Sequence, residues 1–414
     1  MFRFRFSVLG IALFLLICSG CSLFTGTTAV LWTDRPEIAA YVEVFNSEQD
    51  TYKIEVQYKE NPDPAFSQTE KPPDILFGRG LTTTELIGRF SPLDKMYKEE
   101  TLDKQIFYKF LLNEGVREEK QLLLPVSFNL PVIIFKKGTE ADTADNIILT
   151  VDEMENICSS VPGEDTDNPN RLCFAFHWEP SFLYRYTLQA GADFRETAGG
   201  ELAWNESRLR RALSEMTGWS EKINGGLERE LLFTEKHLYN PGYKLVNTEN
   251  IRFYYMELQD FFDIPGEKRE TLDFRWFGTT REITLSDDLL FVGIPQKAKN
   301  KKAARAFLAW YFTEETQRKL LKNARLKRIR SFGIAGGFSS LYRINERDIP
   351  SLYPDMVGMI PPAEYLEIPP SLPLEWPLIK EEVLLPWLHD QAVGKTAENL
   401  DERLREWYLQ RPSR

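Results

Sequence analysis

Residues 124–137 read LPVSFNLPVIIFKK, and this stretch decides how the chain is divided. Val, Ile and Phe favour an extended strand, which Pro125 and Pro131 punctuate. Ser127 and Asn129 stand inside this apolar run, and a buried hydroxyl or amide group needs a hydrogen-bonding partner. We interpret the stretch as a strand that crosses between two lobes and places Asn129 on the wall of the cleft between them. The alternative is an ordinary strand followed by a turn.

The N-terminus has the pattern of a secretory signal. Arg3 and Arg5 precede an apolar stretch at 8–17, and at 1.5 Å per residue this stretch is too short for a bilayer core of about 30 Å. The following Cys18-Ser19-Gly20-Cys21 resembles a bacterial lipobox, although Cys18 stands where that signal usually has Leu. We therefore predict a signal peptide at 1–20, lipidation of Cys21 and a flexible tether at 21–28. The alternatives are a cleaved signal without a lipid and an uncleaved anchor.

Composition limits the partners. The chain has 51 Lys plus Arg against 62 Asp plus Glu, a net charge of −11. An acidic surface argues against nucleic acid and against non-specific adhesion to anionic lipid. The chain beyond residue 20 is long enough for two domains, and its 43% of hydrophobic residues can fill their cores.

Two cysteines, Cys158 and Cys173, remain after the predicted processing. An exported chain can keep a disulfide, and a bridge closing this polar loop would contribute about 3 kcal/mol. Two free thiols are an equal alternative. Neither cysteine has the spacing of a metal ligand, and we predict no metal and no cofactor.

The periodicity of apolar residues indicates an α/β chain. Strands are expected at 29–32, 53–58 and 74–77, with a helix capped by Asp34 between the first two, which is a parallel strand–helix–strand unit. Residues 289–295 (LLFVGIP) form the second candidate crossing strand, and Asn300 is expected to cap the next helix. The proline-rich stretch 350–386 is expected to be extended, because proline interrupts helices.

Short motifs follow one another in order between residues 29 and about 325. They include Leu31-Trp32-Thr33-Asp34, Pro73-Asp74-Ile75, Gly191-Ala192-Asp193-Phe194, Val292-Gly293-Ile294-Pro295 and Ala303-Ala304, besides residues 124–129. Each motif is weak alone. Their order and spacing resemble the extracellular solute-binding proteins of bacterial ABC importers, in the branch whose better-known members bind sugars. The proline-rich tail matches less clearly.

This resemblance implies a class II periplasmic-binding-protein fold, in which two α/β lobes are joined by crossing hinge strands. It places 29–128 and 290–345 in the first lobe, and 129–289 and 346–414 in the second lobe with its C-terminal segment. It further implies a monomer, lipid-anchored to the cell membrane and facing the periplasm or exterior. Such a protein captures a small solute, here expected to be a sugar or oligosaccharide, by closure and delivers it to an ABC permease.

A two-lobed binder takes its ligand contacts from loops at the carboxyl ends of strands in both lobes. Aromatic rings stack on the C–H faces of sugars, while Asp, Asn and Arg bind the hydroxyl groups. The residues nominated on these grounds are Trp32, Asp34, Arg35 and Arg79 in the first lobe, Asn129 in the crossing strand, and His177, Trp178, Arg275 and Trp276 in the second lobe. The alternatives are core positions for the tryptophans, a helix cap for Asp34, solvated or paired arginines, and a turn cap for His177.

Two other functions compete with solute delivery. The same fold could serve as a sensor or a surface interaction lipoprotein, and an extracytoplasmic hydrolase is the third hypothesis. The chain lacks a His-x-x-x-His pair, a Gly-x-Ser-x-Gly elbow and a phosphate-binding glycine loop, so we predict that it is not an enzyme. Asp287 and Asp288 are paired carboxylates in the sequence, as some hydrolases use. Adjacent residues of a strand point to opposite faces, so this adjacency does not indicate a catalytic pair.

Overall fold

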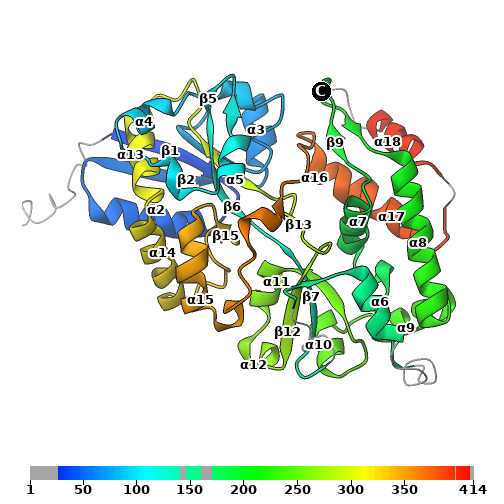
Figure 1. Cartoon of the computed structure of the whole chain (residues 1–414). Coiled ribbons are helices and arrows are strands. Elements are labelled where there is room, and N and C mark those ends of the chain that lie inside the picture. The colour runs from blue at the N-terminus through cyan, green and yellow to red at the C-terminus, as the bar shows by residue number, and fades with distance from the viewer. Residues whose placement is uncertain (1–26, 140–145, 160–169, 397, 411–414) are drawn as a thin grey trace, which may run out of the picture.

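The computed structural model describes residues 27–139, 146–159, 170–396 and 398–410. Two α/β lobes lie side by side and are joined by chain segments that run between them (Figure 1). In this part of the chain no helix is both long and apolar enough to cross a bilayer. The predicted signal peptide and the lipidation site Cys21 lie outside the described residues.

A six-stranded sheet forms the first lobe, in the order β15-β6-β14-β3-β1-β2. The predicted strand–helix–strand unit is confirmed, because β1 runs parallel to both β2 and β3. The strands are β1 (Thr27–Thr33), β2 (Tyr52–Tyr58), β3 (Ile75–Gly78), β6 (Leu123–Phe128), β14 (Leu290–Gly293) and β15 (Phe338–Ser339).

Helices cover this sheet with their apolar sides. They include α2 (Glu37–Glu48), α13 (Lys301–Tyr311) and α14 (Glu314–Leu326). The ring centroids of Phe45 and Phe307 lie 5.3 Å apart where α2 meets α13. The expected cap by Asp34 is wrong, because Pro36 stands at the N-cap of α2 and no side chain caps it. Asn300 does occupy the expected N-cap position of α13, but its side chain makes no capping bond. The amides there are bound by Asp74, whose carboxylate accepts the N–H groups of Lys299 and Asn300 at 2.8 and 2.7 Å.

The second lobe contains a four-stranded sheet in the order β11-β7-β12-β8. Its strands are β7 (Pro131–Lys136), β8 (Ile148–Leu149), β11 (Tyr254–Glu257) and β12 (Leu272–Phe277). Helices around this lobe include α6 (Val151–Ser159), α7 (Pro180–Gln189), α8 (Glu206–Asn224), α9 (Leu227–His237), α10 (Gly242–Asn247) and α11 (Leu258–Asp263). The proline-rich tail is not extended throughout. In it α16 (Trp376–Ile379), a π-helix (Lys380–Leu384) and α17 (Leu385–Ala392) follow one another without a break, and α18 (Leu400–Leu409) comes after them.

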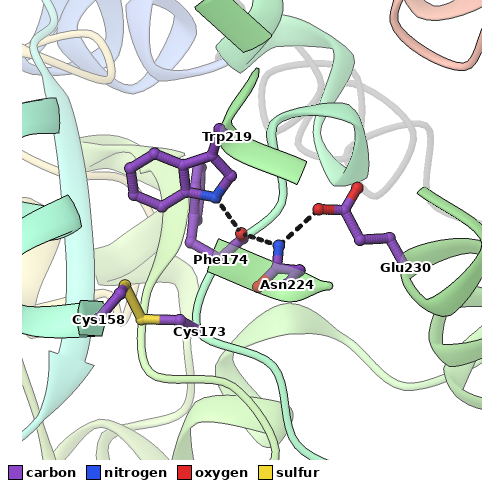
Figure 2. Close-up of a disulfide and its surroundings, with 6 residues drawn as sticks. All are labelled: Cys158, Cys173, Phe174, Trp219, Asn224 and Glu230. Carbon is purple, nitrogen blue, oxygen red and sulfur yellow. Dashed lines mark hydrogen bonds between the residues drawn. A yellow bond between two sulfur atoms is a disulfide. The ribbon is translucent and has the colours of Figure 1, made fainter. Parts of the chain in front are cut away.

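Cys158 and Cys173 form a disulfide, which settles the alternative that the sequence left open. Figure 2 shows how the neighbouring carbonyl of Phe174 accepts two hydrogen bonds, from Trp219 Nε1 and Asn224 Nδ2, both 2.8 Å long. Since both donors lie on α8, the disulfide and these bonds together tie α6 and the chain after residue 172 to α8.

Three segments of the described chain pass between the lobes. The first joins β6 to β7 directly, as the opening stretch of the sequence predicts. The second runs from β13 (Ile283–Thr284) to β14, and the third brings the tail to β16 (Leu366–Glu367), which pairs in parallel with β13. The lobe boundaries in the sequence stay a prediction. Near the expected boundary at 345/346, Asp348 still pairs with Arg318 of α14, at 2.7 Å.

Candidate ligand-binding site

A cavity of about 290 Å³ lies between the two lobes. Residues from three parts of the chain line it: loops at the ends of first-lobe strands, the second crossing segment, and the tail. The lining includes Asp34, Glu60, Asn61, Asp63, Arg79, Gly80, Thr82, Thr83, Asp287, Leu289, Pro369 to Leu374, Trp376 and Leu378. The volume is near the lower limit for small-molecule sites, and the mixture of polar and apolar side chains is typical of them.

Asp34 and Arg79 form the polar part of the first-lobe wall. Because β1 and β3 are parallel neighbours, the residues that follow them meet at the same edge of the sheet. Arg79 donates to Asp34 at 2.6 Å, and the two side chains are 39% and 12% exposed. A carboxylate and a guanidinium side by side can accept from and donate to the hydroxyl groups of one ligand.

Asp63 shapes the same wall from α3 (Pro62–Gln68). Its Oδ2 accepts the backbone N–H groups of Arg79 and Gly80 at 3.0 and 2.8 Å, so it holds the loop that carries Arg79. The carboxylate sits so close to Gly78 that a Cβ at that position would fall 1.7 Å from Oδ1, and therefore only glycine fits. Burial raises the pKa of Asp63 to about 6.

This raised pKa predicts a pH dependence that Asp63→Asn should remove. The folded protein binds a proton more tightly than the unfolded chain does, so stability is highest below the unfolded pKa and falls as pH rises through about 6. From pH 4 to pH 7 we expect the free energy of unfolding of the wild type to fall relative to Asp63→Asn by about 2 kcal/mol. Urea unfolding across this pH range measures the difference. Asp50→Asn, at an exposed position, is the control and should run parallel to the wild type.

Asp287 and Asp288 bind opposite lobes from the second crossing segment. Asp287 contacts the second lobe and the tail, where it accepts from Lys380 Nζ at 2.9 Å and from Trp376 Nε1 at 2.6 Å. Asp288 faces the first lobe and pairs with Arg35 at 3.5 Å. Burial alone would raise both pKa values, but Lys380 and Arg185 hold the pKa of Asp287 well below its usual range, whereas the pKa of Asp288 is raised.

Arg185 of α7 is the buried cation behind this wall, with its side chain only 4% exposed. Its guanidinium binds the carboxylate of Glu257 at 2.9 Å and the carbonyl of Leu285 at 2.9 Å, and it lies 3.8 Å from Asp287. Ser286 also donates to Glu257. Arg185 therefore fixes the crossing segment to the second-lobe sheet, since Glu257 ends β11.

The structure brings three of the nine nominated residues to the cavity or its edge. Asp34 and Arg79 line the cavity, and Arg35 lies beside it through its pair with Asp288. Trp32 is not on the wall, because its ring packs in the first-lobe core and its Nε1 donates to Gln57 at 2.9 Å.

Asn129 was expected on the cleft wall, and the structure corrects this. Its side chain is buried, its Oδ1 accepts from the N–H of Leu130 at 3.0 Å, and its carbonyl accepts from Ser286 at 3.0 Å. Asn129 thus joins the first two crossing segments to each other, and it is not among the residues that line the cavity.

The four nominated second-lobe residues lie elsewhere, so we leave them out of the site. His177 and Trp178 belong to a 3-10 helix (Phe176–Trp178), where Glu230 and Phe233 contact them. On β12, Arg275 lies over the ring of Phe135 at 5.3 Å, and Trp276 donates to the carbonyl of Met359 at 2.7 Å.

Sequence reasoning missed Asp63, Asp287 and Trp376 as members of this site. The ring of Trp376 packs on Tyr184, with the ring centroids 5.3 Å apart, and Trp376 also lines the cavity. The signal that could have found Asp287 was present, because an Asp-Asp pair stands directly before the second expected crossing strand.

No family model and no curated protein sequence matches the chain. Comparison with solved structures nevertheless identifies the fold as that of two-lobed substrate-binding proteins, in agreement with the expected class. The chain is similar to the sugar-binding protein MalE from Xanthomonas citri (TM-score 0.64, 15% identity, covering 93% of this chain and 100% of that one). It is also similar to an ABC substrate-binding protein from Listeria monocytogenes in complex with cycloalternan (0.63, 14%, 92% and 97%) and to maltose-bound MalE3 from T. maritima (0.60, 12%, 92% and 97%).

Proposed function

We propose that this chain is the substrate-binding component of an ABC import system. In this role it captures a small carbohydrate between its lobes and delivers it to a membrane permease. One observation carries the proposal: a cavity lined by both lobes and by a crossing segment, in a fold that matches binding proteins over more than nine-tenths of the chain. Ligand contacts drawn from both lobes favour the closed form, which is the form a permease can recognise.

The chemistry of the wall supports a carbohydrate. Asp34, Asn61 and Arg79 offer acceptors and donors for hydroxyl groups, while Trp376 and the prolines near it offer apolar surface for C–H faces. The solved relatives are described as binding maltose or cycloalternan, which fits the same class of ligand. Their low identity to this chain leaves the particular sugar to experiment.

Thermal-shift screening against neutral monosaccharides and oligosaccharides, followed by calorimetric titration of each hit, tests the proposal. We expect at least one sugar to raise the melting temperature in a concentration-dependent way. Asp34→Ala should weaken its binding by about tenfold or more, because a charge-assisted hydrogen bond is lost. Asp50→Ala, at an exposed position, should leave the affinity unchanged. The proposal would be contradicted if no sugar in the screen bound, or if Asp34→Ala left the affinity for the bound sugar unchanged.

We propose further that the chain works outside the cytoplasm, anchored by a lipid on Cys21. The N-terminal sequence pattern supports this placement. Labelling of growing cells with radioactive palmitate should mark the wild-type protein and not Cys21→Ala, and the variant should leave the membrane fraction. Equal labelling of both proteins would exclude this anchor.

A further inference from the structure

The segment Ile368–Trp376, IPPSLPLEW, contacts both lobes, and we call it the strap. It follows β16 and leads into α16, and Figure 1 shows it between the lobes, beside β9 (Arg195–Glu196). Three of its nine residues are prolines, whose fixed φ angles stiffen the backbone. Because the backbone is stiff, a contact that fixes one end of the strap also restricts the position of its other end.

Leu374 attaches the strap to the first lobe. Its side chain is 8% exposed and belongs to an apolar cluster whose other buried members, among the described residues, lie between Trp32 and Phe291. It sits directly against Gly80, where an added Cβ would lie 3.2 Å from Leu374 Cδ1. The tail of the chain therefore inserts a leucine into the core of the opposite lobe.

The strap is held to the second lobe on both sides of Leu374. Before it, the carbonyl of Ser371 accepts from the N–H of Glu196 at 2.6 Å. After it, the ring of Trp376 packs on Tyr184 and its indole N–H binds Asp287. Separation of the lobes must therefore withdraw Leu374 from its cluster or break these second-lobe contacts.

Glu196 adds a polar contact across the same side of the cavity. Its Oε2 accepts from both the backbone N–H and the Oγ1–H of Thr84, each at 3.1 Å. Thr84 follows Thr82 and Thr83, which line the first-lobe wall. These hydrogen bonds are exposed, so each contributes little to the free energy that keeps the lobes in contact. Burial of the Leu374 side chain contributes most of it.

We propose that the strap is a latch in which Leu374 is the positioning residue and Thr84–Glu196 the polar partner. The latch holds the lobes together at one end of the cavity and sets how often that end opens. Its significance for solute entry rests on the proposed function, but its existence does not. Side chains and backbone groups of this chain make every contact that the latch needs.

Hydrogen exchange of the ligand-free protein tests the latch. The Thr84 amide can exchange only when its bond to Glu196 opens, so a peptide covering 81–87 reports on opening. Leu374→Ala should speed exchange of this amide by about tenfold or more, although the Leu374 side chain does not bond to Thr84. The same variant should enlarge the radius of gyration in X-ray scattering. Leu374→Met, which keeps the volume, should restore both values.

Leu372→Ala is the matched control, because Leu372 lies on the strap but packs against the second-lobe cluster. It should leave Thr84 exchange and the radius of gyration at wild-type values. The proposal is overturned if Leu374→Ala lowers the melting temperature while both readouts stay at wild-type values, since Leu374 would then be an ordinary core residue. No sugar enters these measurements, so a failed ligand screen and a failed latch are separate results.

Discussion

Arg185→Met is expected to lower the free energy of unfolding by about 3–5 kcal/mol, because it removes one partner of a buried charge network. Glu257 would lose its 2.9 Å ion pair, the Leu285 carbonyl would lose its donor, and Asp287 would keep Lys380 but lose the second cation. Methionine fills part of the volume and offers no donor. Urea unfolding at pH 7, with the disulfide intact, measures the loss.

Arg211→Met is the matched control for this prediction. Arg211 also lies on a second-lobe helix and pairs with a glutamate, Glu215, but its side chain is 67% exposed. Exposed pairs contribute at most about 1 kcal/mol, so this variant should remain close to the wild type. If Arg185→Met cost no more than Arg211→Met, the network around the crossing segment would not be what holds it in place.

Trp276→Ala is expected to cost about 3–5 kcal/mol of stability, as the removal of a buried aromatic side chain generally does. The side chain is fully buried on β12, its ring centroid lies 5.9 Å from that of Phe338 in the first-lobe sheet, and its N–H binds the Met359 carbonyl. Chemical denaturation measures the cost. Any sugar found in the screen should bind the folded variant with its usual affinity, because Trp276 does not line the cavity.

Trp204→Ala serves as the comparison for Trp276→Ala. Trp204 is only partly buried and its indole binds Glu206 on the surface, so its loss should be clearly smaller. The opposite pattern, in which Trp276→Ala stays stable but loses sugar binding, would restore Trp276 as the ligand contact that its sequence position suggested.

Much of the fold was readable from local patterns. The first crossing, the strands of the first lobe and the helix after residue 300 follow from alternation and helical periodicity, because one face of each element must be buried whatever it packs against. The helix caps were less readable. Asp34 has the right residue type and position for a cap, yet it binds Arg79, which stands 45 residues further along the chain.

The candidate site was readable only in part. Asp34 and Arg79 could be nominated because parallel neighbouring strands bring their ends together. His177, Trp178 and Trp276 could not be judged, since an aromatic or polar side chain at an expected strand end can turn to the core as easily as to the cleft. Trp376 and Leu374 came from a tail whose path over the lobes no local pattern reveals.

The sequence by itself determined that this is an acidic α/β chain whose stretch 124–137 crosses between the lobes, whereas the export signal stays a prediction and the proline-rich tail is more helical than expected. Tertiary structure alone decided which polar groups face the cavity, that Asn129 joins crossing segments, and that the tail returns to contact both lobes. The reason is physical. Periodicity records which side of an element is buried, whereas a site depends on long-range contacts that bring together residues hundreds of positions apart.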